Sequence, residues 1–355
     1  MKIIRLGTYK TGFTYYKVKG KGTGKGKCEA KVEITDSREI DKIKELKIPP
    51  AYENVTILNN KKIIAYGYDS KNRKQVLYHP SFIATQNIKK YNKISASIKF
   101  FSKLKKKVSE DLNGNGGINE KTMAIAVIIS LILSCGFRIG NKKYEKDNNS
   151  VGLTTLKYKH IAFKDNKVVI DFIGKKGVRN VAECDNKRIY EYLYHKHATA
   201  MSNASDTKDI KETYIFNYEG GEGNEGNEGN ERSERSEANK VISSSDVNEY
   251  LRVISEPYSI IITTKDLRTW NANMLFLTYY RKLQKLRKRT SKRREATDAD
   301  TKKDTDAEAA KTAKEVEKDI KKAIEMVAEK LHNSYSICKK SYIDPKIIDE
   351  LLHKN

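Results

Sequence analysis

The longest apolar run of the chain, Met123 to Leu133, constrains the fold more than any other feature. It is shorter than the roughly 20 residues that a membrane-spanning helix needs, so we expect it to be buried inside the protein. It lies within a helical pattern from Glu120 to Ser134, and Gly136 follows where a glycine commonly ends a helix. The sequence therefore predicts a buried core helix.

The sequence pattern changes at about residue 90. Residues 1–90 contain short β-rich runs separated by turn residues, and the runs 61–68 and 74–78 are typical strands of a small sheet. Residues 91–355 have mostly helical patterns. We therefore expect an α+β fold, with a small β-rich N-terminal domain (1–90) and a mostly α-helical second domain (91–355).

Several elements of the second domain can be placed from the sequence. Gly174 to Gly177 separate two apolar runs, a pattern typical of a β-hairpin. One helix is predicted to begin at Thr264 as its cap, with Leu267 and Trp270 on its apolar stripe. Other helical segments are predicted at 96–108, 185–200 and 309–331.

Three segments have too biased a composition to form a core. Residues 219–240 repeat Glu-Gly-Asn and then Glu-Arg-Ser, which predicts a disordered insertion. Residues 282–314 are first basic and then acidic, as expected of a charged insertion that is a solvated helix or a linker. The glycine–lysine stretch at 20–26 matches neither common phosphate-loop spacing, so it predicts a mobile basic loop.

Charge indicates the kind of partner. Lys and Arg total 70 against 46 acidic residues, which gives a net charge of +24. Such an excess favours a polyanion, most commonly nucleic acid, although AT-rich coding also enriches lysine. The four cysteines form no CxxC pair, and His195 and His197 stand alone, so neither a zinc cluster nor a disulfide framework is expected. The N-terminus lacks the apolar region of a signal peptide, and we expect a soluble, cytoplasmic protein.

Four residues form a set that is chemically sufficient to cut a phosphodiester. The phenol of Tyr342 would need nearby cations, because a free tyrosine has a pKa near 10 and is about 0.1% ionised at neutral pH. Arg138 and Arg268 could match the charge that builds on the non-bridging oxygens. Lys175 could protonate the expelled oxygen. No metal or other cofactor is needed for this chemistry.

Each residue also has an ordinary interpretation. Arg138 could be a charge partner at a helix end, Lys175 a solvated residue on a hairpin tip, and Arg268 a surface residue beside an apolar stripe. Tyr342 is one of 21 tyrosines. Spacing alone does not decide between the two interpretations.

Several motifs in the same order resemble the type IB DNA topoisomerases of the small poxvirus and bacterial kind. The resemblance extends over about residues 46–345, apart from the two insertions. Its motifs are IPPAY (48–52), GYDSKNRKQ (67–75), YHP (78–80), CGFRIG (135–140), YE (144–145), VGLTTL (151–156), KDLRTW (265–270) and CKKSY (338–342).

The resemblance implies a role for each candidate. Tyr342 would be the nucleophile, Lys175 the general acid, and the two arginines would hold the scissile phosphate. Poxvirus enzymes have a histidine nine residues before the tyrosine, whereas this chain has Asn333 there and His332 one residue earlier. Similar bacterial members carry asparagine, and an amide can also donate a hydrogen bond to a phosphate oxygen. The alternative for Asn333 is a helix cap.

The resemblance also implies a partner and a mechanism. The protein would be a monomeric clamp around duplex DNA that forms a 3′-phosphotyrosyl bond, allows strand rotation and religates without ATP. A large DNA virus would be its source, and the virion or the cytoplasm of the infected cell its location. DNA contacts are expected from Tyr66, Tyr68, Arg73, Gln75, Tyr78, Lys142 and Tyr144.

Two rival functions remain open from the sequence. Tyrosine recombinases share this chemistry, but they usually have histidine where this chain has Lys265. A non-enzymatic DNA-binding protein would bind with a steep salt dependence and form no covalent adduct.

Overall fold

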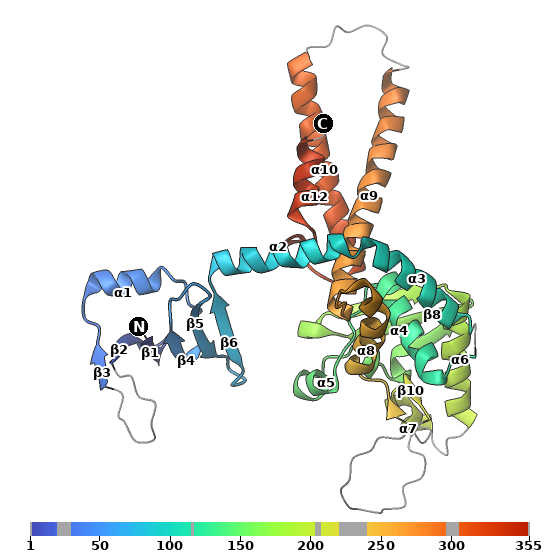
Figure 1. Cartoon of the computed structure of the whole chain (residues 1–355), viewed down its shortest axis with the longest axis horizontal. Helices are drawn as coiled ribbons and strands as arrows, with labels where there is room; N and C mark the ends of the chain where they lie inside the picture. The colour runs from blue at the N-terminus through green and yellow to red at the C-terminus, as the bar shows by residue number, and fades with distance from the viewer. Residues whose placement is uncertain are drawn as a thin grey trace, which may run out of the picture. The chain divides into compact units, whose positions relative to one another are not determined.

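The computed structural model describes residues 2–19, 30–114, 117–202, 207–219, 240–295 and 305–353. The chain divides into two compact units, Met1–Lys93 and Ile94–Asn355, and helix α2 (Pro80–Ala96) leads from the first into the second (Figure 1). The sequence analysis did not predict α2. The predicted basic loop at 20–26 lies outside the described residues, as does nearly all of the predicted insertion at 219–240.

The first unit contains a six-stranded antiparallel sheet in the order β3-β2-β1-β4-β5-β6. Its core is formed by apolar side chains such as Val55, Ile57 and Ala65, and Ile43 packs on them from α1. The predicted strands at 61–68 and 74–78 are confirmed as β5 and β6. The bounds are β1 (Lys2–Thr8), β2 (Gly12–Lys19), β3 (Ala30–Glu33), α1 (Ser37–Lys44), β4 (Glu53–Ile57), β5 (Ile63–Tyr68) and β6 (Lys74–Tyr78).

Helix α4 (Glu120–Cys135) forms the centre of the second unit. Its side chains from Ala124 to Ile129 are all buried, and it packs against α3, α8, α9, β9 and β10. Asn119 caps its first turn, and Gly136 ends it in the left-handed conformation with φ 69°. The predicted core helix is therefore confirmed, including its terminating glycine.

A three-stranded antiparallel sheet in the order β7-β8-β9 packs beside this core. The predicted hairpin is confirmed as β8 and β9, whereas β7 was not predicted. The remaining elements before α9 are α3 (Ile98–Leu112), α5 (Lys142–Asn148), β7 (Ile161–Lys164), β8 (Lys167–Ile173), β9 (Arg179–Cys184), α6 (Lys187–Ser202), α7 (Thr207–Glu212), β10 (Asn217–Tyr218), β11 (Lys240–Val241) and α8 (Ser244–Ser255).

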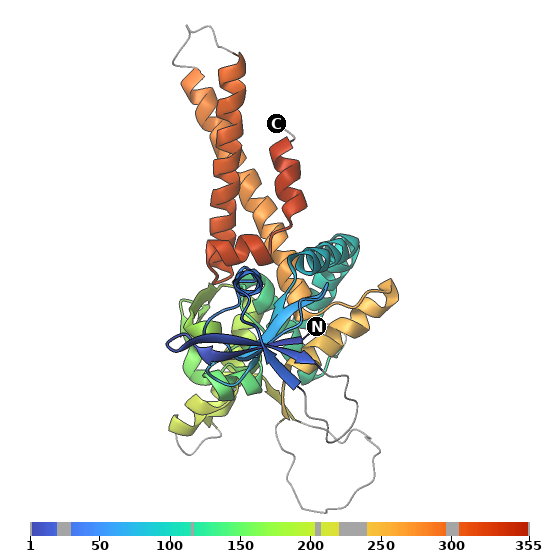
Figure 2. The same cartoon turned by 90° about the vertical axis from the view of Figure 1, so that its left-hand side faces the viewer.

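Two long helices, α9 (Thr264–Glu295) and α10 (Thr305–Lys330), lie side by side in Figure 1 and Figure 2. The predicted charged insertion at 282–314 falls largely on them and is helical wherever it is described, while residues 296–304 lie outside the described part. Phe276 and Tyr280 of α9 pack against Ile324 and Val327 of α10 in a second hydrophobic cluster. This cluster also includes residues of α11 (Tyr335–Ser341) and α12 (Pro345–His353).

The predicted cap of α9 was wrong by one residue. The hydroxyl of Thr263 accepts from the N–H of Asp266, and the Asp266 carboxylate accepts from the N–H and the hydroxyl of Thr263. Thr263 is therefore the capping residue, because its carbonyl also accepts the first helical hydrogen bond, from Leu267. Thr264 is the first helical residue, and its N–H donates to Asn248 instead. Within the described residues, no helix is both long and apolar enough to span a membrane.

Candidate active site

Tyr342 lies directly after α11, where its backbone N–H donates to the Cys338 carbonyl. Its hydroxyl is 3.3 Å from Nε of Arg268, and the Arg268 guanidinium carbon is 5.5 Å from the centre of the Tyr342 ring. Burial alone raises the pKa of the Tyr342 phenol, but the charges and hydrogen bonds of Arg268 and Arg138 outweigh burial and lower this pKa. The structure therefore places Tyr342 where its phenolate is favoured.

Arg268 lies in the early part of α9 and is only 4% exposed. One terminal nitrogen, Nη2, donates to the backbone carbonyl of Leu331, while the other, Nη1, is buried and has no hydrogen-bond partner among the described residues. Burial, together with the positive charge of Arg138, lowers the pKa of this guanidinium to about 10, so it remains charged at neutral pH. A buried N–H of a cation without an acceptor is costly, and a bound anion would supply the missing acceptor.

Arg138 and Asn333 form the other half of the site. Arg138 follows the glycine that ends α4, and its Nη2 donates to Oδ1 of Asn333 at 2.6 Å. The Asn333 nitrogen, Nδ2, is buried without a hydrogen-bond partner in the described part of the chain. Of these two unpaired buried donors, Arg268 Nη1 belongs to a residue in contact with Tyr342, and Asn333 Nδ2 belongs to a residue bonded to Arg138.

The Asn333 side chain does not cap α11, although its backbone N–H donates to the Ala328 carbonyl at the end of α10. The residue that caps α11 is Ser334, whose side chain accepts from the N–H of Ile337. The side-chain oxygen of Asn333 is instead engaged with Arg138.

The structure does not bring Lys175 into contact with these four residues. Lys175 begins an exposed turn, Lys175–Gly177, between β8 and β9. No hydrogen bond or ion pair within the described part of the chain involves its side chain. Lys176 has a left-handed backbone with φ 64°, and Gly174 lies so close to Asn180 that a side chain would not fit.

The DNA-contact candidates of the first unit cluster on one hairpin. Arg73 Nε and Gln75 Nε2 both donate to Asp69 Oδ2 at 2.9 Å, and Lys74 lies over the Tyr66 ring at 4.2 Å. The hydrogen bonds from Arg73 lower the pKa of Asp69 to about 2. Tyr68 lies on the same strand as Tyr66.

The remaining DNA-contact candidates are one residue at the end of this hairpin and two residues of the second unit. Tyr78 ends β6 and stacks on Phe82 with ring centres 5.4 Å apart. Lys142 and Tyr144 belong to α5 in the second unit, where Lys142 lies 5.4 Å from the centre of the Tyr214 ring and Tyr144 is 64% exposed.

Sequence reasoning missed one residue that holds the tyrosine. Asn273 is 5% exposed, its Nδ2 donates to the Tyr342 carbonyl at 2.8 Å, and its Oδ1 accepts from the Asp344 N–H at 2.8 Å. The only available sequence signal was a polar residue within the apolar helix that carries Arg268.

Comparison with known families decides what kind of protein carries this site. Residues 72–354 match the family model described as "Eukaryotic DNA topoisomerase I, catalytic core". The chain belongs to this family. It is a type IB DNA topoisomerase, and it relaxes supercoiled duplex DNA by transient cleavage of one strand through a phosphotyrosyl intermediate.

Viral topoisomerases are among the similar proteins. The chain is 28% identical over 313 residues to DNA topoisomerase 1B of Acanthamoeba polyphaga mimivirus, covering 88% of this chain and 79% of that protein. It is 29% identical over 174 residues to DNA topoisomerase I of Monkeypox virus and to DNA topoisomerase 1B of Vaccinia virus. Each of those matches covers 45% of this chain and 49% of the poxvirus protein. The type IB assignment and the mixed fold, with a β-rich and a mostly helical part, agree with the sequence analysis.

Proposed function

We propose that Tyr342 is the nucleophile of this topoisomerase and that Arg138, Arg268 and Asn333 hold the scissile phosphate. The observation that carries the proposal is the pair of buried, unpaired donors, Arg268 Nη1 and Asn333 Nδ2, beside a tyrosine whose pKa is lowered. A non-bridging phosphate oxygen would satisfy both donors. A purely structural role would leave both unsatisfied in the folded protein.

The reaction follows from this arrangement. The Tyr342 oxygen attacks the phosphorus, the bond from phosphorus to the 5′-oxygen breaks, and a 3′-phosphotyrosyl bond replaces it. The phenol loses its proton, which the lowered pKa favours. The arginines match the charge that grows on the phosphate oxygens, and religation reverses these steps. The phosphotyrosyl bond conserves the energy of the cleaved bond, so ATP is not consumed.

Lys175 is proposed as the general acid that protonates the leaving 5′-oxygen. Its exposed position on the β8–β9 turn leaves it accessible to a DNA strand. Catalytic hydrogen bonds commonly form only in the complex with substrate, so its lack of a partner without DNA is compatible with this role.

Duplex DNA is the substrate, and we propose that both units contact it. Tyr66, Tyr68, Arg73, Gln75 and Tyr78 would do so from the first unit, and Lys142 and Tyr144 from the second. Aromatic and basic side chains suit contacts to sugars and phosphates. We also propose that the two units clamp the duplex and that the protein acts as a monomer. Its proposed location is the virion or the cytoplasm of the infected cell. The viral relatives support this location.

One experiment tests the nucleophile. The wild-type protein and Tyr342→Phe are mixed with an end-labelled duplex and denatured. Wild type should give a protein–DNA band, and Tyr342→Phe should give none while still retarding the duplex in a gel. Relaxation of a plasmid without any special site separates this function from that of a recombinase, which needs defined sites.

A further inference from the structure

His332 has a backbone conformation that is unusual for its residue type. It lies between α10 and α11 with φ 51°, in the left-handed region that favours glycine. A residue with a side chain is strained there by about 1 kcal/mol or more. Such strain persists only where surrounding contacts hold the residue in place.

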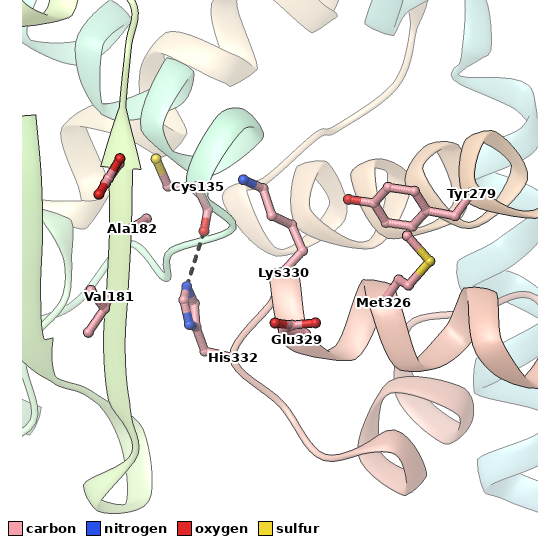
Figure 3. A pocket seen from close by; sticks show the side chains of 9 residues that line it. Cys135, Val181, Ala182, Tyr279, Met326, Glu329, Lys330 and His332 are labelled. Atoms are coloured by element: carbon pink, nitrogen blue, oxygen red, sulfur yellow. Dashed lines mark hydrogen bonds between the residues drawn. The ribbon is translucent and has the colours of Figure 1, made fainter. Parts of the chain in front are cut away.

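Backbone bonds from the His332 N–H to the Glu329 carbonyl and from the Asn333 N–H to the Ala328 carbonyl form the left-handed turn that ends α10. The contacts of the His332 ring restrain this turn further. The ring stacks on Phe137, with ring centres 5.4 Å apart and planes 16° apart, and its Nε2 is 3.2 Å from the Cys135 carbonyl oxygen. In Figure 3 the ring points toward this carbonyl. The ring also lines a pocket of about 290 Å³. Cys135, Glu329 and Lys330 also line the pocket.

The residues on both sides of His332 are tied to the proposed phosphate-holding arginines. The Leu331 carbonyl accepts from Arg268, and the Asn333 side chain accepts from Arg138. Phe137, on which the ring stacks, is the neighbour of Arg138. The ring therefore joins segment 331–333 to segment 135–138 where both arginines are held.

We propose that His332 is a positioning residue that sets the distance and orientation between Arg138 and Asn333. This inference rests on the proposed function of those two residues. The ring itself is engaged with Cys135 and Phe137, and Asn333 is the residue bonded to Arg138. His332 therefore acts through its neighbours and is not the counterpart of the poxvirus histidine.

The charges around the ring favour its neutral form. Burial lowers the pKa of His332, the charges of Arg268, Lys330 and Arg138 lower it further, and the bond with the Cys135 carbonyl opposes them. Glu183 and Glu329 are the acidic residues lining the pocket. With Nε2 carrying the hydrogen, neutral His332 donates to the Cys135 carbonyl.

The test compares single-turnover cleavage, duplex affinity and melting temperature. His332→Gly removes the ring and relieves the backbone strain, and it should slow cleavage by about 10- to 100-fold, because small misplacements of catalytic groups are that costly. Duplex affinity should change by less than about twofold, since this positioning concerns the bond-breaking step. His332→Phe should retain the stacking and the fold but lose the bond with the Cys135 carbonyl, so it should still slow cleavage. This second variant keeps the test decisive if the glycine variant fails to fold.

The matched control is Ser259→Gly. Ser259 is an exposed residue with a similar left-handed backbone, φ 55°. This variant should relieve strain and leave the cleavage rate unchanged.

A double-mutant cycle decides between indirect and direct action. If His332 acts through Asn333, His332→Gly should cost much less in an Asn333→Ala background than in wild type. Equal losses in both backgrounds, or wild-type cleavage by both His332 variants, would overturn the inference. Failure of the proposed function would look different, because Asn333→Ala and Arg138→Ala would then cleave at the wild-type rate.

Discussion

The Arg138 guanidinium donates to the side-chain oxygen of Asn333 across 2.6 Å, which fixes the orientation of the Asn333 amide. Arginine has only donors, so the amide must present its oxygen to Arg138 and its NH₂ elsewhere. That NH₂ is buried and unpaired. The protein thereby orients an unpaired hydrogen-bond donor next to Arg138.

Replacement of Asn333 tests this donor. Asn333→Ala should cut the single-turnover cleavage rate by roughly 10- to 1,000-fold, the scale of one lost transition-state hydrogen bond. Ser334→Ala is the matched control: it removes the cap of α11, so it should lower the free energy of unfolding by about 1 kcal/mol and leave the rate nearly unchanged. If Ser334→Ala slowed cleavage and Asn333→Ala did not, Asn333 would not be the residue that makes the catalytic contact.

A histidine at position 333 should introduce a pH dependence. Asn333→His should retain much of the activity, because a neutral imidazole can accept from Arg138 with one nitrogen and donate with the other. Protonation removes the acceptor and places a positive charge against Arg138. The rate should therefore fall as pH drops through the imidazole pKa, near 6.5 for an unperturbed histidine. A rate that rises toward acid would contradict this geometry.

Tyr342→Phe should abolish the covalent adduct and supercoil relaxation, since only the attacking oxygen is lost. Duplex affinity and melting temperature should change little. Tyr335→Phe, at the start of α11, is the control and should retain full activity. Adduct formation by the Tyr342 variant, assayed on a labelled duplex, would rule out Tyr342 as the nucleophile.

Arg268→Ala should lose on the order of 10²-fold or more in cleavage rate, as when one oxyanion donor is removed. It should also raise the pKa of Tyr342, because burial raises this pKa and Arg268 supplies the largest opposing charge. The limb of the pH–rate profile on which the rate rises as the phenol ionises should move to higher pH accordingly. Arg252→Ala, an exposed arginine of α8, should change neither quantity. An unmoved profile for Arg268→Ala would mean that Arg268 does not tune the phenol.

The sequence could predict those parts of this site that depend on local patterns. The apolar run and the glycine that follows it indicate α4 and its end, and therefore the location of Arg138. Which side chain caps a helix depends on details of backbone geometry, and the predicted cap at Thr264 was wrong by one residue.

Other features depend on tertiary contacts that have no local signal. The stacking of the His332 ring on Phe137 and its bond with the Cys135 carbonyl join segments that are far apart in the sequence. The unpaired donors of Arg268 and Asn333 become visible only when burial is known. The role of Lys175 stays a prediction, since no contact in the structure tests it.

Lys175→Ala should slow cleavage strongly, and a duplex with sulfur in place of the 5′-bridging oxygen should recover much of the rate. A thiolate is a far better leaving group and needs no proton, so this rescue is specific to a general acid. Lys176→Asn is the control, because asparagine tolerates the left-handed backbone of residue 176 and removes the same charge. Loss without sulfur rescue would indicate a simple phosphate contact.

Asn273 should couple stability to catalysis. Its side chain bonds the Tyr342 carbonyl and the Asp344 N–H from within α9, so it fixes the backbone that directly follows the Cα of the nucleophile. Asn273→Leu has a similar shape but leaves both backbone groups unpaired, which should cost about 2 kcal/mol or more in the free energy of unfolding. Cleavage should slow as well, because the phenol is no longer held against Arg268. Asn271→Leu is the control, since Asn271 bonds the Leu133 carbonyl instead and should lose stability with little effect on the rate of the folded protein. Chemical denaturation and single-turnover cleavage of both variants separate the two effects, and equal rates in both would show that the backbone of Tyr342 needs no such support.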